Sequence, residues 1–105
     1  MEWYPHLYIG DKVKDSKKVI QKLNKYPKFL NIYVLTLSKN PHDQIDIYKA
    51  GYLSWCYYKK NPPYVIGIAS DYEEALSIVE KITAEAFKTT GNCRIKDYLL
   101  SKIDD

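Results

Sequence analysis

The sequence has few of the residues from which catalytic and cofactor sites are usually built. It holds two cysteines, Cys56 and Cys93, and two histidines, His6 and His42. The cysteines match no CxxC pattern, and these four residues lack the short spacings that zinc sites use. The four glycines of the chain form neither a GxGxxG nor a GxxxxGK[ST] phosphate loop. We therefore expect no metal and no cofactor, and the sequence favours a protein that is not an enzyme.

Long apolar runs are also missing. No stretch approaches the roughly 18 apolar residues that a membrane-spanning helix needs. Residues 1–5, Met-Glu-Trp-Tyr-Pro, do not open a secretory signal, which would carry an apolar segment here. We therefore expect a cytoplasmic protein with reduced thiols and with no membrane partner.

Arginine is nearly absent, because Arg94 is the single arginine among 16 basic residues. Arginine grips phosphates and guanine edges with two parallel hydrogen bonds, whereas lysine is a hydrated point charge, so a sequence-specific DNA binder would normally carry more arginine. Residues 1–60 hold 11 lysines against 5 acidic residues, and residues 61–105 hold 5 basic against 8 acidic residues. Such a dipolar chain can steer a charged partner, although two solvated surfaces of opposite sign explain the same pattern.

Hydrophobic residues make up 46% of the chain and charged residues 28%, which are the proportions of one folded domain over residues 1–105. Runs rich in β-branched and aromatic residues predict strands at residues 5–10, 30–38 and 64–69. Gly67 interrupts the third run and predicts a bulge or the close approach of another element.

Apolar residues at helical spacing predict helices between these strands. The first begins at Asp15 or Ser16, whose side chains can accept a hydrogen bond from a free backbone N–H, and it stops before Pro27. The clearest helix follows residues 70–73, Ser-Asp-Tyr-Glu, which have the pattern of a capping box. We predict that this helix ends at Gly91 in a left-handed conformation.

Residues 42–49 and 95–103 are interpreted as two further helices, although the alternation of Ile45 and Ile47 also fits a strand. The predicted order is therefore β-α-β-(α)-β-α-(α). It indicates an α/β fold, a two-layer sandwich in which amphipathic helices pack on a small, mostly parallel three-stranded sheet. A second copy can complete the exposed edges of such a sheet, so we expect a homodimer.

Three stretches together resemble a group of small uncharacterised bacterial proteins. They are residues 6–10 (His-Leu-Tyr-Ile-Gly), residues 62–69 (Pro-Pro-Tyr-Val-Ile-Gly-Ile-Ala) and residues 72–76 (Tyr-Glu-Glu-Ala-Leu). The resemblance implies a bacterial, cytoplasmic protein, and it carries over no activity, cofactor or catalytic residue.

The most unusual segment of the chain combines aromatic rings with lysines. Such rings suit a protein or subunit interface or single-stranded nucleic acid, and they can equally complete the core. Our leading hypothesis is a non-catalytic binding domain that uses this segment to contact its own copy or another protein. The alternative is binding of RNA or single-stranded DNA through the Lys- and Tyr-rich N-terminal half. The candidate contact residues of the aromatic segment are Trp55, Tyr57, Tyr58, Lys59 and Lys60.

A candidate anion site lies in the turn at residues 10–18. Lys12, Ser16 and Lys17 lie at or just before the predicted helix start, where lysines oppose the positive end of the helix dipole. A bound phosphate would relieve this conflict, and flexible solvated lysines explain the same pattern. The corresponding hypothesis is a sensor of a phosphorylated metabolite, or a small enzyme acting on one.

Overall fold

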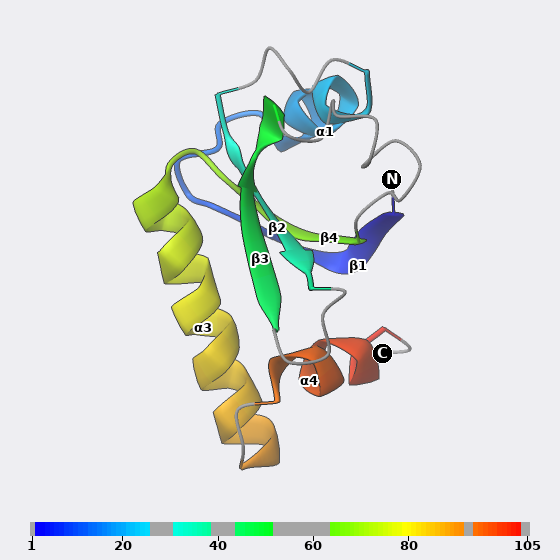
Figure 1. Ribbon diagram of the computed structural model, residues 1–105, viewed down its shortest axis with the longest axis vertical. Coiled ribbons are helices and arrows are strands. Elements are labelled where there is room, and N and C mark those ends of the chain that lie inside the picture. Colours follow the sequence, from blue (N-terminus) through cyan, green and yellow to red (C-terminus); the bar gives the residue numbers. More distant parts are fainter. Residues whose placement is uncertain (1, 26–30, 39–43, 52–63, 92–93, 104–105) are drawn as a thin grey trace.

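The computed structural model describes residues 2–25, 31–38, 44–51, 64–91 and 94–103. Four strands form one sheet in the order β1-β4-β2-β3, so β1 and β3 are its edges within these ranges. β1 and β4 are parallel, and the other two neighbouring pairs are antiparallel. Along the chain (Figure 1) the elements are β1 (Glu2–Ile9), α1 (Ser16–Lys25), β2 (Tyr33–Leu37), β3 (Ile45–Lys49), β4 (Tyr64–Ala69), α3 (Tyr72–Thr90) and α4 (Ile95–Ser101).

The α/β class is confirmed, but the predicted sheet is wrong in two respects. The observed sheet has four strands where three were predicted, and it is mixed where a mostly parallel sheet was predicted. The additional strand is β3, where a helix over residues 42–49 was predicted. Its residues pair with β2 from Ile45 opposite Leu37 to Lys49 opposite Tyr33. The apolar residues of β3 alternate, and pairing with a buried neighbouring strand favours that period over the helical one.

Helices pack against both faces of the sheet, whereas a two-layer sandwich was predicted. Side chains of β4 alternate between two clusters. Val65 and Ile68 pack with Leu23 of α1, and Ile66 packs on the opposite face with residues of α3 and α4. Figure 1 shows α1 at the top of the sheet, α3 along its left side and α4 at the bottom. A strand buried on both faces must be apolar throughout, which explains the unbroken apolar run of β4.

The helix α3 begins one residue later than the capping-box pattern predicted. Its N-cap is Asp71, whose Oδ1 accepts a hydrogen bond from the Glu74 amide at 2.8 Å. Glu74 reaches back, and its Oε1 accepts from the Ser70 amide at 2.9 Å. A carboxylate at this position also carries negative charge to the positive end of the helix. Gly91 ends the helix with a φ of 77°, so the predicted left-handed terminator is confirmed.

The prediction for Gly67 is confirmed as well. The pairing registers of β4 with both neighbouring strands shift close to this residue. A Cβ at Gly67 would lie 3.0 Å from the carbonyl oxygen of Tyr8 in β1, which is tighter than ordinary packing. The missing side chain therefore lets β1 approach β4 closely, and this approach positions Tyr8 at the site described next.

Candidate functional site

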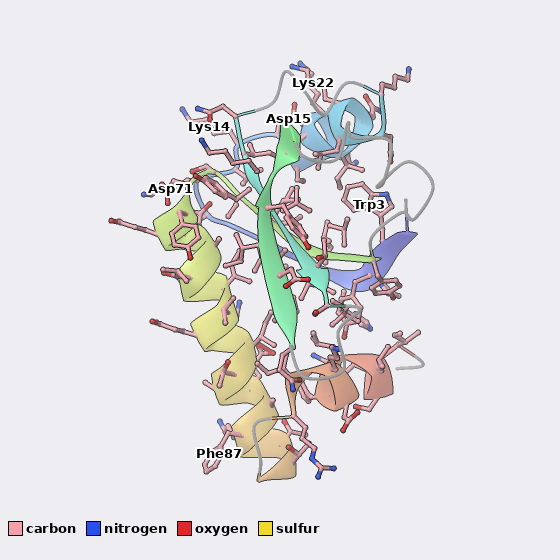
Figure 2. All side chains as sticks on the ribbon, viewed as in Figure 1. Trp3, Lys14, Asp15, Lys22, Asp71 and Phe87 are labelled. Carbon is pink, nitrogen blue, oxygen red and sulfur yellow. The ribbon has the colours of Figure 1, made fainter. Side chains whose placement is uncertain are left out.

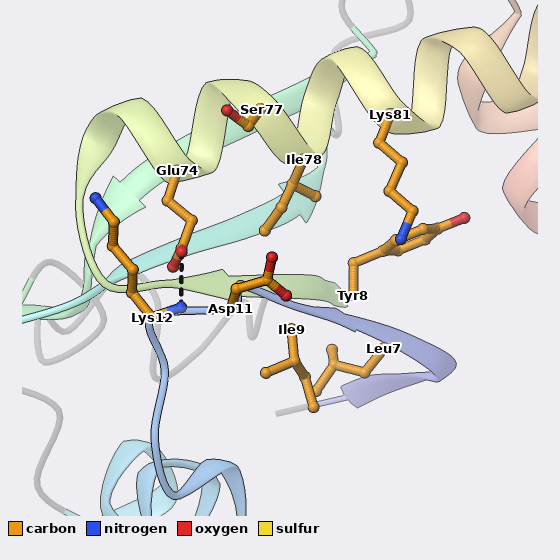
Figure 3. A pocket seen from close by; sticks show the side chains of 10 residues that line it. Leu7, Tyr8, Ile9, Asp11, Lys12, Glu74, Ser77, Ile78 and Lys81 are labelled. Carbon is orange, nitrogen blue, oxygen red and sulfur yellow. Dashed lines mark hydrogen bonds between the residues drawn. The ribbon is translucent and has the colours of Figure 1, made fainter.

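A groove of about 410 Å³ lies between the C-terminal end of β1 and the N-terminal half of α3 (Figure 3). We call it the β1–α3 groove. One wall is formed by residues 7–12, which comprise the end of β1 and the turn that follows it, and the other by Glu74, Ser77, Ile78 and Lys81 of α3. These helix positions follow an i, i+3, i+4, i+7 spacing, so they share one side of the helix. From Glu74 to Lys81 a helix rises by about 10 Å, the length of roughly three residues of extended chain.

At one end of the groove, Glu74 links α3 to the turn after β1 by hydrogen bonds. Its Oε2 accepts a hydrogen bond from the Lys12 amide at 2.8 Å, while its Oε1 is bonded to the Ser70 amide. A Cβ at Gly10 would overlap this carboxylate, so the glycine makes room for it. The Gly10 amide itself donates to the carbonyl of Ile68 in β4 at 2.9 Å. The turn after β1 is thus joined to the start of α3 and to the end of β4.

An ion pair adds to this junction at the surface. The ammonium of Lys12 lies 3.1 Å from Oδ2 of Asp71. The pKa of the Asp71 carboxyl is lowered, mainly because the carboxylate accepts a hydrogen bond from the Glu74 amide. A second hydrogen bond, from the Lys12 ammonium, lowers this pKa further. The same hydrogen bond, together with the charge of Asp71, raises the pKa of Lys12. Both groups are exposed to solvent, so the pair orients the turn more than it stabilises the fold.

The predicted anion-site residues lie where carboxylates of the chain already act as acceptors. The amide and ammonium of Lys12 both have such partners, as described above. Ser16 is the first residue of α1, with Lys17 exposed beside it. The Lys18 amide donates to Oδ1 of Asp15 at 3.2 Å, so that aspartate takes the place of an N-terminal anion. This arrangement disfavours phosphate at the turn, because an entering anion would have to displace these carboxylates.

The other end of the groove is formed by Tyr8 and Lys81. The Lys81 ammonium lies 5.9 Å from the centre of the Tyr8 ring, and it forms no ion pair with the residues that the structure describes. The hydroxyls of Tyr8 and Tyr98 both donate to Oε1 of Glu85, at 3.2 and 3.3 Å. Burial, and then the charge of Glu85, raises the pKa of Tyr8, so its phenol stays a neutral donor. Oε2 of Glu85 is buried without a hydrogen-bond partner in the described ranges.

The open edge of β1 runs beside the groove. Among the described residues, β1 pairs only with β4. Because the Gly10 amide points toward β4, strand alternation directs the amide and carbonyl of Ile9 outward, and those of Leu7 likewise. The side chain of Ile9 is 42% exposed. Pro5 has no N–H, so the C-terminal end of the strand offers the usable part of this edge.

The outer face of α1 is basic. Leu23 is its buried residue, and the side chains on the opposite side are exposed. Figure 2 shows Lys22 projecting from α1 at the end of the molecule far from Phe87. The exposed lysines of the helix are Lys17, Lys18, Lys22 and Lys25.

The predicted aromatic interface cannot be placed, because it lies outside the described residues. This applies to Trp55, Tyr57, Tyr58, Lys59 and Lys60. Conversely, sequence reasoning did not identify Glu74, Lys81 or Glu85 as a site. The available signal was their spacing of seven and four residues, which places three charged residues along one side of a helix that is otherwise apolar toward the sheet.

No family model matches the chain, and the comparisons with curated proteins and with solved structures give no match. Within the described ranges, no group of three or more His, Cys, Asp or Glu residues could hold a metal ion. None of the helices described above is long and apolar enough to cross a membrane. Function is therefore inferred from the groove itself.

Proposed function

We propose that this protein is a non-catalytic binding domain that takes an extended peptide segment of a partner protein into the β1–α3 groove. One observation carries the proposal: the groove lies between an open strand edge and the side of a helix. In this arrangement a peptide adds to the sheet as a further strand. Backbone hydrogen bonds to Leu7 and Ile9 would supply affinity for a peptide of any sequence. Contacts between the peptide's side chains and the helix wall would supply specificity.

The lining of the groove indicates which peptide it suits. Ile78 offers an apolar side chain in the middle, whereas the side chain of Ile9 points away from α3 in Figure 3. Lys81 leaves a positive charge at one end, and Asp11 places an exposed carboxylate below Ile78, between Glu74 and Tyr8 in Figure 3. We therefore expect a short segment with an apolar residue in the middle, an acidic residue toward Lys81 and a basic residue toward Asp11.

The same charges disfavour a phosphorylated metabolite in the groove. Glu74 and Asp11 line it, and the ammonium of Lys12 is already paired with Asp71. Among the described residues that line the groove, a phosphate would find one unpaired ammonium, that of Lys81, and would meet two carboxylates nearby. A peptide with charges of both signs meets no such conflict.

Selection from a display library of random peptides on the immobilised protein tests the proposal. Ser77→Trp places a bulky ring in the groove, and Ala84→Trp places the same ring on an exposed position of α3 outside it. Selected peptides should bind the wild type and Ala84→Trp alike and should lose at least about tenfold in affinity, or about 1.4 kcal/mol, with Ser77→Trp. Binding should also slow hydrogen exchange at the Leu7 and Ile9 amides. If no selected peptide responds to Ser77→Trp, the groove is not a peptide site.

The basic face of α1 supports a second candidate function, the binding of RNA or single-stranded DNA. Its four exposed lysines would displace counterions condensed on the phosphates, so the affinity should fall steeply with added salt. A labelled oligonucleotide should then shift at low salt, and Lys18→Glu with Lys22→Glu should abolish the shift. An oligonucleotide that binds no better to the wild type than to the double variant excludes this function.

A further inference from the structure

We infer that two copies of this protein associate through the free edge of β3, which pairs antiparallel with itself about a two-fold axis at Ile47. The two four-stranded sheets then become one continuous sheet. This edge lies on the opposite side of the sheet from the β1–α3 groove, so the inference is independent of the proposed function.

Hydrogen bonds at the two ends of β3 show which of its residues face the open edge. The Ser38 amide donates to the carbonyl of Gln44 at 3.2 Å, just before the strand. The Ala50 amide donates to the carbonyl of Ile32 at 2.9 Å, just after it. Even-numbered residues of β3 therefore bond to β2, and odd-numbered residues direct their N–H and C=O groups outward. Within the described ranges β3 has no other strand beside it. The outward residues are Ile45, Ile47 and Lys49.

A symmetric pair centred on Ile47 uses all three outward residues. Ile47 stands opposite its own copy, and Ile45 stands opposite Lys49, which allows about six backbone hydrogen bonds between the subunits. On the other face of the strand, Asp46 stands opposite Tyr48. Within one chain the Tyr48 hydroxyl already donates to Oδ2 of Asp46 at 3.2 Å, so the pair meets a compatible group in the second copy.

Neighbouring registers are less favourable. A pair centred on Asp46 places two carboxylates directly opposite each other, which destabilises a strand pair. In a pair centred on Tyr48, Asp46 no longer stands opposite Tyr48 of the second copy, and fewer residues of the two β3 strands pair. Lysine at a strand edge commonly opposes such pairing. Here Lys49 is exposed and faces Ile45, so its aliphatic stem can pack while its ammonium stays in water.

Exposed apolar side chains lie on the same side of the molecule. Ile45 and Ile47 are only half-buried on the face covered by α3. Beside them α3 presents Tyr72 and Leu76, which are 51% and 40% exposed. The Tyr72 ring packs edge-on against Tyr33 of β2, with ring centres 5.7 Å apart, so this side of α3 faces β2 and β3.

A two-fold axis normal to the sheet fixes where the second copy's helix lies. It puts both α3 helices on one face of the joined sheet, on either side of the two β3 strands, so that their exposed apolar side chains point toward each other. Burial of Ile45, Ile47 and Leu76 then adds an apolar contribution to the backbone hydrogen bonds. Phe87 does not belong to this surface, because it points away from the sheet in Figure 2.

Sedimentation velocity of the wild type up to about 0.1 mM tests the association, since an interface with a Kd tighter than roughly 10 μM would be mostly occupied there. Lys49→Pro removes an outward N–H, and Lys49→Ala keeps it; this N–H takes no part in the pairing of β3 with β2. We expect a dimer for the wild type and for Lys49→Ala, and at least about tenfold weaker association for Lys49→Pro. A wild type that stays monomeric overturns the inference.

A cysteine cross-link tests the register in a Cys56→Ser, Cys93→Ser background. In the predicted pair, Ile47→Cys brings two thiols across the axis, with Cα atoms about 5.5 Å apart, within reach of a disulfide. Lys49→Cys places the two thiols much farther apart and serves as the matched control. We expect an oxidised dimer with Ile47→Cys and none with Lys49→Cys. A dimer that persists in Lys49→Pro, or that fails to cross-link through Ile47→Cys, uses another surface and contradicts the inference.

Discussion

Replacement of Gly10 by alanine should release the carboxylate that closes the β1–α3 groove. A Cβ at this position would overlap the carboxylate of Glu74 and lie 2.8 Å from its Cγ. Gly10 does not have a positive φ, so the alanine backbone itself is unstrained. The Glu74 side chain can rotate away, but it then loses its hydrogen bonds to the amides of Ser70 and Lys12. The cost of the substitution is therefore the cost of these two bonds.

The first of these bonds is partly buried and the second is exposed. We assign about 1.5 kcal/mol to the first and about 0.5 kcal/mol to the second, because water can replace an exposed acceptor. Gly10→Ala should thus lower the free energy of unfolding by about 2 kcal/mol, or the melting temperature by about 8 °C in a domain of this size. Glu74→Ala removes the same two bonds and should cost a similar amount.

The double variant separates this explanation from a general intolerance of alanine. Once Glu74 is truncated, the methyl group at Gly10 has room, so the second substitution should cost nothing or gain about 0.5 kcal/mol by restricting the unfolded chain. Urea unfolding of the four proteins measures the coupling, which we expect near 2 kcal/mol. Costs that simply add, within about 0.5 kcal/mol, would refute the proposed role of the carboxylate.

Three further outcomes follow from single residues. Gly91→Ala should lower the free energy of unfolding by about 1 kcal/mol because of its φ of 77°, and Gly91→Asn should cost less, as urea unfolding would show. Asp71 has a lowered pKa, so its contribution to stability is fully present above the ordinary carboxyl pKa near 4 and is lost as the pH falls through its pKa in the folded protein. The difference in the free energy of unfolding between wild type and Asp71→Asn should therefore vanish in acid. Tyr8 has a raised pKa, so stability should fall as the pH rises above about 10, where the unfolded chain ionises. Tyr8→Phe should reduce that alkaline loss in unfolding curves measured at pH 8 and pH 11.

Local chemistry predicted much of the fold. Apolar runs located the strands at residues 64–69 and 30–38, and Gly91 marked the end of α3. The failure at residues 42–49 has a specific cause, since apolar residues at positions 45 and 47 with an aromatic residue at 48 satisfy both the helical and the extended period. Pairing with β2 decides between them, and that contact forms only when the sheet does.

The candidate site was less predictable because it joins distant parts of the chain. The sequence indicated the turn containing Lys12, but it could not show that Glu74, 62 residues later, accepts the Lys12 amide. An isolated helix with polar residues at 74, 77 and 81 has an ordinary solvated side. Only the topology, with β1 at the edge of the sheet and α3 lying beside it, turns that side into the wall of a groove.

The two edges of the sheet differ in ways that suit different occupants. The β1 edge contains Pro5, and its pairing with β4 shifts register between Trp3 and Tyr8, so a long partner strand would lose several bonds there. A short segment avoids this loss by using the end of the strand beside α3. The β3 edge is regular over its whole length, contains no proline and is complementary to itself about Ile47. Because the sheet order places these edges apart, a second copy at β3 leaves the groove open, and a dimer would carry two grooves at the outer ends of one sheet.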